Sequence, residues 1–444
     1  MKVPPLNTND KNENKKLSCF TATSLVIANI IGTGIFVSLG FQAMSISSQF
    51  CLLFAWFIGG IIALCGALSY GELAAALPRS GGEYHFLSKI YRPSLGFLAG
   101  WVSATVGFSA PIAAAALALG MYIKEVYPSL SPVFVASSVV IVFTIINSVD
   151  VGVGSYFNNF FTVLKILVIF IFCCTGLVWG KAQPVHIVPS YHDLSCICSS
   201  SFAVSLVFIA YAYSGWNAAT YITSEIENPA RNLPRSLLSG TALVMVIYIL
   251  INYIFLYTIP PHELPGPTVG AVAAKNIFGP IGGKIMSLTI SIVLLSTINS
   301  MIITGPRVTK VMGEDMPLLG VFAITTQNGV PLYAMLLQLV ISLFFIITAT
   351  FDQVLTYIGF TLTLFTALTV LGVFVLRGKY PNLPRPYRAW GYPLTPALFL
   401  LLNGWMLVFL LKDKPKESLA GFATVLTGLV LYVILKNRGT IRPN

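Results

Sequence analysis

Long apolar stretches separated by short polar segments recur along the chain from Leu17 to Leu435. Each stretch holds about 20 residues, enough for a helix to cross a hydrocarbon core of roughly 30 Å. The pattern therefore predicts about twelve membrane-spanning helices. Their expected ranges are 18–39, 48–76, 94–123, 131–147, 158–180, 199–223, 236–258, 283–306, 332–350, 354–377, 393–411 and 418–436.

Two of these spans are interrupted by residues that favour turns. The first span contains IGTGI at 31–35, and the sixth contains YSGWN at 213–217. Glycines in membrane helices also serve as close-packing positions, so each interruption alone leaves both interpretations open. The two interruptions, however, open successive sets of five spans, and glycine-interrupted helices in matching positions are typical of inverted-repeat transporters. We therefore expect broken helices at both places.

The expected fold class is an all-α, polytopic membrane protein with a five-plus-five inverted repeat and two extra C-terminal helices. The apolar segment that follows the polar N-terminus lacks a small-residue cleavage site, so we interpret it as a retained helix and not as a signal peptide. The expected organisation is a disordered cytoplasmic tail at 1–17, repeats at 18–181 and 199–377, helices eleven and twelve within 390–436, and a cytoplasmic tail at 437–444.

Composition and charge agree with lipid as the solvent. Hydrophobic residues make up 56% of the chain and charged residues only 9%, against about 25% charged in soluble domains. The net charge of +11 does not indicate nucleic-acid binding, because lysines and arginines lie in short loops and form no single stripe. Of these, 18 fall on one side of the predicted membrane and 7 on the other, which predicts that both termini are cytoplasmic.

The breaks offer a chemistry that suits one class of ligand. A broken helix leaves unpaired N–H groups at the start of its second half and unpaired carbonyls at the end of its first half. The N–H groups near Thr33 and Gly34 suit a carboxylate, whereas the carbonyls near Ile30 and within 211–214 suit an ammonium. Glycine at 34 and at 215 would let the ligand approach the backbone closely. The pair of partners describes a zwitterionic α-amino acid.

At these residues the sequence resembles the amino acid-polyamine-organocation (APC) superfamily, and within it the bacterial relatives of the L-type amino acid transporters. The resemblance implies a permease that carries amino acids by alternating access. Four stretches in the family's order, spread over more than two-thirds of the chain, carry it: IIGTGIFVSLG, SYGELAAALPRSGGEYHFL, AYAYSGWNAATYITSEIENPARNLPRSL and GPRVTKVMGEDMPL.

The resemblance also implies roles for particular residues. Tyr211 occupies the place of an aromatic gate where the L-type branch has phenylalanine, and Ser214 stands where that branch has glycine. Asn217 matches the asparagine after the family's tryptophan. The implied site comprises the backbone of Thr33 and Gly34 for the carboxylate, the carbonyls of Ile30, Tyr211, Ala212 and Ser214 for the ammonium, and Gly215 and Asn217 beside them.

Heteromeric animal members of the family join a partner chain through a cysteine in the loop after the third helix. Here that loop, KEVYPSLSP, contains no cysteine. We therefore expect a stand-alone prokaryotic carrier in the bacterial inner membrane, with no heavy-chain partner.

Lys165 is an ionisable residue inside the fifth span, which is by default a hypothesis of function. It lies roughly 10 Å from the span's cytoplasmic end, so a snorkelling side chain is the alternative. The resemblance implies that its ammonium takes the place of a sodium ion against the first and eighth helices. Lys165 would then couple a proton to transport or hold the first helix, and both roles predict sodium independence.

The remaining polar residues suggest no catalytic centre. No nucleophile–base pair and no metal-ligand spacing occur at membrane depth, so an intramembrane enzyme, a cofactor and a metal are not expected. A channel or a non-transporting receptor on the same scaffold stays open as an alternative. Because no acidic residue falls near the breaks in the span map, a neutral substrate is favoured. Charges beside the inner loops are interpreted as interfacial in preference to gate ion pairs, namely Glu72, Arg79, Glu83, Glu225, Glu227, Arg231, Arg235, Arg307, Glu314 and Asp315.

The seven cysteines do not form a disulfide framework. Cys196 and Cys198 are separated by one residue and are poorly placed for a mutual disulfide, and no role is assigned to them. Five others lie in apolar runs and are interpreted as small core residues: Cys19, Cys51, Cys65, Cys173 and Cys174.

Overall fold

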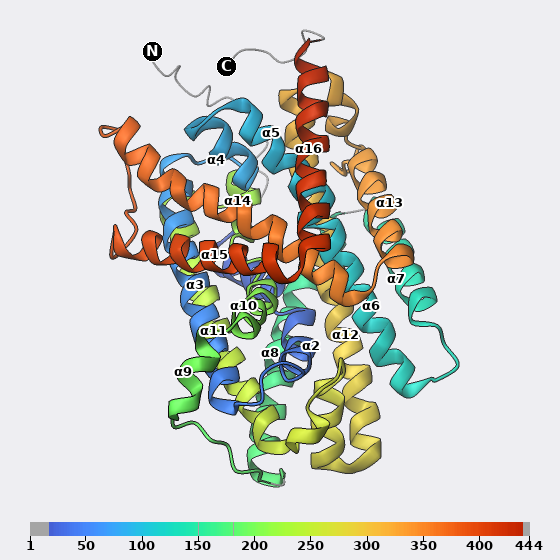
Figure 1. The fold of residues 1–444 in the computed structure, drawn as a ribbon. Helices are drawn as coiled ribbons and strands as arrows, with labels where there is room; N and C mark the ends of the chain where they lie inside the picture. The colour runs from blue at the N-terminus through green and yellow to red at the C-terminus, as the bar shows by residue number, and fades with distance from the viewer. Residues whose placement is uncertain (1–16, 150, 181, 438–444) are drawn as a thin grey trace.

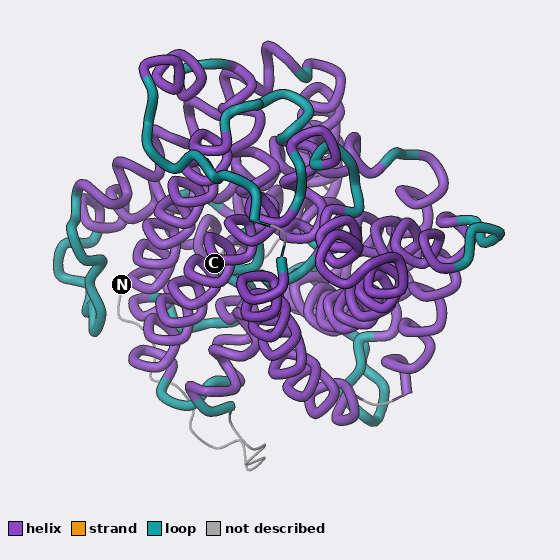
Figure 2. The backbone as a smooth tube through the Cα atoms, turned by 90° about the horizontal axis from the view of Figure 1, so that it is seen from below, coloured by secondary structure: helices purple, strands orange, loops and turns teal. Residues whose placement is uncertain are grey.

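The computed structural model describes residues 17–149, 151–180 and 182–437, and within them the regular structure is helical apart from one isolated bridge between Leu17 and Ile226. The helices form one bundle, and both ends of the described chain lie at the end of the molecule that carries α4 and α5 (Figures 1 and 2). We call this the terminal end. The predicted tails, 1–17 and 437–444, lie almost wholly outside the described residues.

The described helices follow the predicted series of apolar stretches, although fewer than twelve are long enough to count as spans by length and composition. Among the described residues, nine helical segments are long and apolar enough to cross a membrane, and three shorter apolar helices accompany them. The expectation of an all-α polytopic protein is confirmed. The first five spans and the short helix α4 have these bounds: α1 Cys19–Ile30 with α2 Thr33–Gln42; α3 Gln49–Ala76; α4 Gly82–Ile90; α5 Pro93–Val102, a π-helical turn Ser103–Gly107 and α6 Ser109–Val126; α7 Pro132–Val149; and α8 Val151–Trp179.

The second part of the chain departs from the predicted ranges at the eighth span. That span was expected at 283–306, but α12 runs over Val269–Asp315, with a non-helical backbone at Gly279 directly before Pro280. Charged residues near both ends of α12 had shortened the apolar window. The elements are α9 Tyr191–Ile197, α10 Ser200–Ala212, η2 Ala218–Glu225, α11 Pro229–Thr258, η3 Pro261–Glu263, α12, η4 Pro317–Ala323, α13 Leu332–Thr348, α14 Phe351–Lys379, α15 Leu394–Asp413 and α16 Pro415–Asn437.

Several spans begin at a hydroxyl residue that satisfies an otherwise unpaired N–H group. The side chain of Ser18 accepts from the backbone of Thr21 at the start of α1, and Ser48 and Ser199 do the same for α3 and α10. Thr350 forms a reciprocal capping box with Gln353 at the start of α14. Polar caps of this kind fix where each apolar helix starts.

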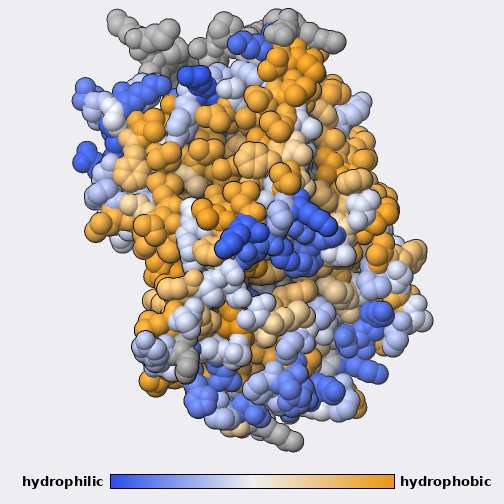
Figure 3. Space-filling view, in the orientation of Figure 1, coloured by the Kyte–Doolittle hydropathy of each residue, from blue (hydrophilic) through white to orange (hydrophobic). Residues whose placement is uncertain are grey.

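The surface of the bundle is largely apolar. Apolar side chains predominate over the face seen in Figure 3, and the hydrophilic ones gather in separate patches. Large apolar side chains project outward from several spans, for example Phe160, Phe170, Val246 and Phe344. A surface of this kind suits lipid, in which apolar side chains need no cover.

The cysteines follow the faces of their helices. Cys51, Cys65 and Cys173 are buried, Cys19 and Cys196 are half-buried, and Cys174 and Cys198 are exposed. The interpretation as core residues is therefore correct for three of the five and wrong for Cys174. Successive residues of a helix point about 100° apart, so Cys173 faces the bundle while its neighbour faces outward.

Candidate functional site

The first span is broken as the sequence predicted. Helix α1 ends at Ile30 and α2 begins at Thr33, so Ile31 and Gly32 form the first break. No side chain caps the start of α2. The amide groups at that end are therefore left for a ligand or for water. Gly34, one residue further on, approaches the sixth span so closely that a Cβ would lie 2.3 Å from Cα of Ala212.

The sixth span is broken too, although its second part differs from the expected α-helix. Helix α10 ends at Ala212, turns follow, and the chain continues as the 3₁₀ helix η2. We call 213–217 the second break. Gly215 has a φ of 97°, and a Cβ there would lie 2.8 Å from the backbone carbon of Asn29. Each break thus packs against the other span through one glycine, which accounts for the glycines at both places.

The carbonyls expected to bind an ammonium are partly engaged by the protein. The hydroxyl of Tyr248, on α11, lies 2.7 Å from the carbonyl oxygen of Ile30 and 3.1 Å from that of Ala212. The Tyr211 hydroxyl lies 2.8 Å from Oγ1 of Thr33, so this residue does cover the first break. In this conformation the carbonyls of Ile30 and Ala212 are therefore satisfied by the protein. No pattern in the sequence pointed to Tyr248, because it lies in an uninterrupted apolar span.

Lys165 contacts both the first and the eighth span. Its Nζ donates to the carbonyl oxygens of Ala28 at 3.3 Å and Ile31 at 3.1 Å, and to Oγ1 of Thr297 on α12 at 2.8 Å. The side chain is 0% exposed, so the snorkelling alternative is wrong. Thr297 also donates to Ile31 and completes the contact between the first and eighth spans. The Nζ of Lys165 thus occupies the carbonyls that a metal cation could otherwise use.

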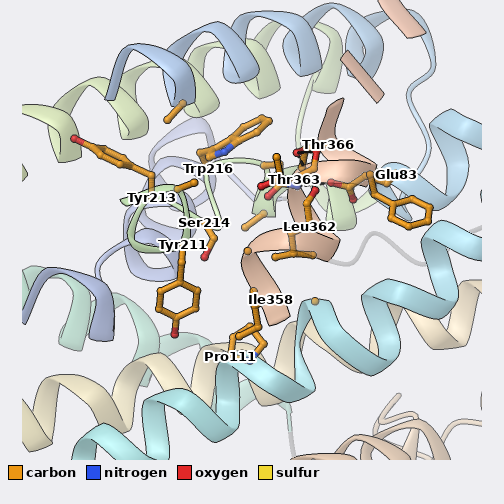
Figure 4. Close-up of a pocket in the computed structure, with 18 of the residues that line it drawn as sticks. Glu83, Pro111, Tyr211, Tyr213, Ser214, Trp216, Ile358, Leu362, Thr363 and Thr366 are labelled. Carbon is orange, nitrogen blue, oxygen red and sulfur yellow. Dashed lines mark hydrogen bonds between the residues drawn. The ribbon is translucent and has the colours of Figure 1, made fainter. Parts of the chain in front are cut away.

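A central cavity adjoins the second break. Figure 4 shows Tyr211, Ser214 and Trp216 on one side of it, with residues of α6 and α14 across from them. Of the predicted site, Tyr211, Ser214, Gly215 and Asn217 line this cavity, whereas Ile30, Thr33, Gly34 and Ala212 pack behind it. Its walls are mainly apolar, with side chains that include Ile62, Ala63, Val102, Phe108, Ile358, Leu362 and Phe399.

A buried carboxylate also lines the cavity, which corrects the sequence interpretation. Glu83, at the start of α4, is 4% exposed and accepts from the side chains of Asn217 and Tyr221. The premise that no acidic residue lies near the breaks is therefore wrong. The span map placed Glu83 in an inner loop, but α4 folds back into the bundle and brings it to the second break.

The terminal end is closed by contacts between segments. Arg79 pairs with Asp315 at 2.8 Å, and Arg307 with Glu225 at 3.3 Å. Leu17 joins η2 through a backbone bond of 2.7 Å to the carbonyl of Glu225. These charges were interpreted as merely interfacial, but they link elements distant in sequence, as gate ion pairs do.

Glu72 was also interpreted as an interfacial charge, and its burial contradicts that interpretation more strongly. Its side chain is 0% exposed and pairs with Arg377 at 2.6 Å and Arg385 at 3.6 Å. It also accepts from the backbone N–H of Ala389. The carboxylate therefore fixes the loop between α14 and α15 to α3 and is no surface charge.

Asp193 and His85 are among the titratable groups outside the spans that have shifted pKa values. Hydrogen bonds from Ser48 and Ser190 lower the pKa of Asp193, in α9, to about 2. Burial lowers the pKa of His85, in α4, to about 4. Within the described residues, no three His, Cys, Asp or Glu side chains group closely enough to hold a metal ion.

Broken helices of this kind do not by themselves identify a protein family. The comparison with known families does so. A family model described as amino acid permease matches residues 17–435. The chain belongs to this family. Amino acid transport across a membrane is therefore the activity of its group, and the expected membership of the APC superfamily is confirmed.

Similar proteins span nearly the whole permease. The human large neutral amino acids transporter small subunit 2 is 28% identical over 435 residues, covering 95% of this chain and 80% of that protein. The mouse b(0,+)-type amino acid transporter 1 is 28% identical over 433 residues, covering 95% and 88%. The serine/threonine exchanger SteT of Bacillus subtilis (strain 168) is 27% identical over 441 residues, covering 98% and 99%. Two of them are named transporters and one an exchanger, and none is named an enzyme.

Proposed function

We propose that this permease is a secondary active transporter of amino acids in the bacterial plasma membrane, and neither an enzyme nor a channel. The observation that carries the proposal is the pairing of the two breaks beside one central cavity. Discontinuous helices at a repeat interface form the substrate sites of such carriers. The backbone of Thr33 and Gly34 would take the substrate carboxylate once the breaks separate. Repeats at 18–181 and 199–377, with 390–436 added, are the proposed organisation.

Transport is proposed to be independent of sodium, by proton symport or by exchange of amino acids. Support comes from Lys165, whose ammonium already bridges the first break and Thr297. A cation fixed there leaves those oxygens unavailable to a metal ion. The positive-inside distribution supports cytoplasmic termini, so that the terminal end faces the cytoplasm.

The substrate side chain is proposed to be neutral. The reason is the cavity itself and no longer the absence of an acidic residue near the breaks. Most of the cavity wall is apolar, and the carboxylate of Glu83 is already engaged by donors from the protein. A stand-alone carrier is proposed because the loop at 124–132 has no cysteine to join a heavy chain. The B. subtilis relative is named an exchanger, which supports testing exchange first.

Purified protein in liposomes tests the proposal. Uptake of a panel of labelled amino acids is measured with and without internal unlabelled substrate, with an imposed pH gradient, and in sodium or potassium buffer. Saturable uptake that is unaffected by sodium and is stimulated by internal substrate or by the gradient is expected. Non-saturable flux would favour a channel, binding without uptake would favour a receptor, and sodium-driven uptake would contradict the role proposed for Lys165.

A further inference from the structure

Glu83 is held at the cavity by neutral donors. Its Oε1 accepts from the hydroxyl of Tyr70 at 2.9 Å and from Nδ2 of Asn217 at 2.5 Å, and its Oε2 accepts from the hydroxyl of Tyr221 at 2.6 Å. Within residues 17–149, 151–180 and 182–437, no lysine, arginine or histidine forms an ion pair with it. The carboxylate therefore acts on its neighbours by accepting hydrogen bonds.

These contacts decide which way the amide of Asn217 points. A carboxylate only accepts, so the atom of the amide that faces Glu83 must be the nitrogen. The same Nδ2 also lies 3.2 Å from the hydroxyl of Tyr221. No hydrogen bond to Oδ1 is found in the part of the chain that the structure describes, and Asn217 lines the cavity. The amide oxygen is thus left as an acceptor for a ligand.

We propose that Glu83 is a positioning residue for substrate recognition, which fixes the amide of Asn217 so that its oxygen accepts from a donor group of the substrate. The donor is the substrate ammonium or a side-chain hydroxyl, which share this chemistry. The inference rests on the proposed transport function. Glu83 acts through Asn217 and does not touch the substrate.

A double-mutant cycle tests the coupling of the two residues. In Glu83→Gln both side chains are amides that can turn either way, so KM for serine uptake rises by at least about fivefold, the worth of one hydrogen bond. In Asn217→Asp two carboxylates face each other, and KM rises further because like charges repel. The double variant exchanges amide and carboxylate and keeps an acceptor toward the cavity. Its KM returns to within about threefold of the wild type, a non-additive result.

Serine and alanine identify the donor. If a hydroxyl donates to Asn217, Glu83→Gln raises KM for serine and leaves KM for alanine unchanged. If the ammonium donates, KM rises equally for both. Either pattern supports the inference, and the loss is expected in KM more than in the maximal rate, which a general loss of folded protein would lower instead.

The matched control is Glu227→Gln, which removes a carboxylate from an exposed position after η2 and is expected to leave KM unchanged. Additive effects in the cycle, with normal wild-type uptake, overturn this inference and leave the proposed function intact. Absence of wild-type uptake of any amino acid overturns both. If Glu83→Gln does not fold, Glu83→Asp retracts the carboxylate by one methylene. An unchanged KM in that variant overturns the inference as well.

Discussion

The two breaks are held by buried charges of opposite sign. At the first break, the ammonium of Lys165 donates to the carbonyls of Ala28 and Ile31. At the second, the carboxylate of Glu83 accepts from Asn217. Neither charge has an ion-pair partner among the described residues. Each is balanced by the backbone or side-chain dipoles of a break, in keeping with the rule that buried charges must be hydrogen-bonded.

The breaks differ in what they leave open. The carbonyls of the first break are occupied by Lys165 and Tyr248, whereas the second break presents Ser214, Gly215 and Asn217 to the cavity. The carbonyls of the first break are thus satisfied by the protein itself, whereas the second break is open to a ligand. A broken helix can therefore bind a ligand only through those unpaired groups that the protein does not already satisfy.

The glycines at which the breaks meet give the largest expected effect. Gly34→Ala would place a methyl group on the backbone of Ala212, and Gly215→Ala would meet the backbone of Asn29 at a φ of 97°. Overpacking costs about 1–3 kcal/mol even where side chains can yield, and backbone yields less. Uptake in liposomes is expected to be lost in both variants, with expression reduced far less.

Gly404→Ala is the matched control, since a Cβ there meets no atom within 4 Å. It should transport like the wild type. Normal transport by Gly34→Ala and Gly215→Ala would show that the breaks need not pack together and would remove the basis for the site.

Removal of the charge at the first break gives the next largest effect. Lys165→Ala leaves the carbonyls of Ala28 and Ile31 and the hydroxyl of Thr297 without their shared donor. An unsatisfied buried group costs about 1–3 kcal/mol, so the transport rate should fall at least about tenfold. Uptake with and without an imposed pH gradient measures the loss and shows whether Lys165 also carries the coupled proton.

The control for this variant is Lys284→Ala, at an exposed position of α12, which should leave uptake unchanged. Wild-type rates in Lys165→Ala would contradict any need for a cation at the first break. Uptake that is reduced but keeps its dependence on the pH gradient would assign Lys165 to holding the first helix alone.

The sequence predicted the spans because hydropathy and helix length follow directly from the bilayer thickness. It predicted both breaks from glycines in matched spans. It misjudged α12, whose charged ends extend beyond the apolar window, and the second half of the sixth span, which is the 3₁₀ helix η2. Local patterns do not separate a 3₁₀ from an α-helical turn when tertiary contacts decide the backbone.

The backbone groups of the candidate site could be predicted from the sequence, but most of the side chains around them could not. Lys165 was identified because a charge inside an apolar run is conspicuous, but Tyr248 and Thr297 were not, since neither interrupts its span. Glu83 was seen and assigned to a loop. Its approach to Asn217 depends on the fold of α4 back into the bundle, a contact between residues far apart in sequence.

A smaller effect is expected at the donor that joins the breaks. Tyr248→Phe removes the hydroxyl shared by the carbonyls of Ile30 and Ala212. The closed conformation then holds two unpaired acceptors, which a substrate ammonium can satisfy. KM should fall by about fivefold and the maximal rate should fall with it, because a net hydrogen bond is worth about 1 kcal/mol. Tyr253→Phe, on the same helix, is the control. A raised KM would instead indicate that the Tyr248 hydroxyl binds the substrate.

The smallest effect concerns the segment that holds the second break. His85 follows Glu83 in α4, and its pKa is lowered to about 4 by burial, with the positive charges of Arg79 and Lys89 adding to the shift. The unfolded side chain titrates near pH 6.5, so below that pH the unfolded state binds the extra proton. Stability from neutral His85 is therefore complete above about pH 6.5 and is lost as the pH falls toward 4.

Thermal unfolding of the purified protein at pH 7 and pH 5 measures this loss. It should reach about 2 kcal/mol at pH 5. For a chain of this length that corresponds to a melting temperature lower by about 2 °C. His85→Gln, which does not titrate, should show a correspondingly smaller decrease, whereas His262→Gln, at an exposed position, should behave like the wild type. Equal decreases in the melting temperature of the wild type and of His85→Gln would mean that protonation of His85 does not destabilise α4. The contact of Glu83 with the second break would then not depend on the protonation of His85.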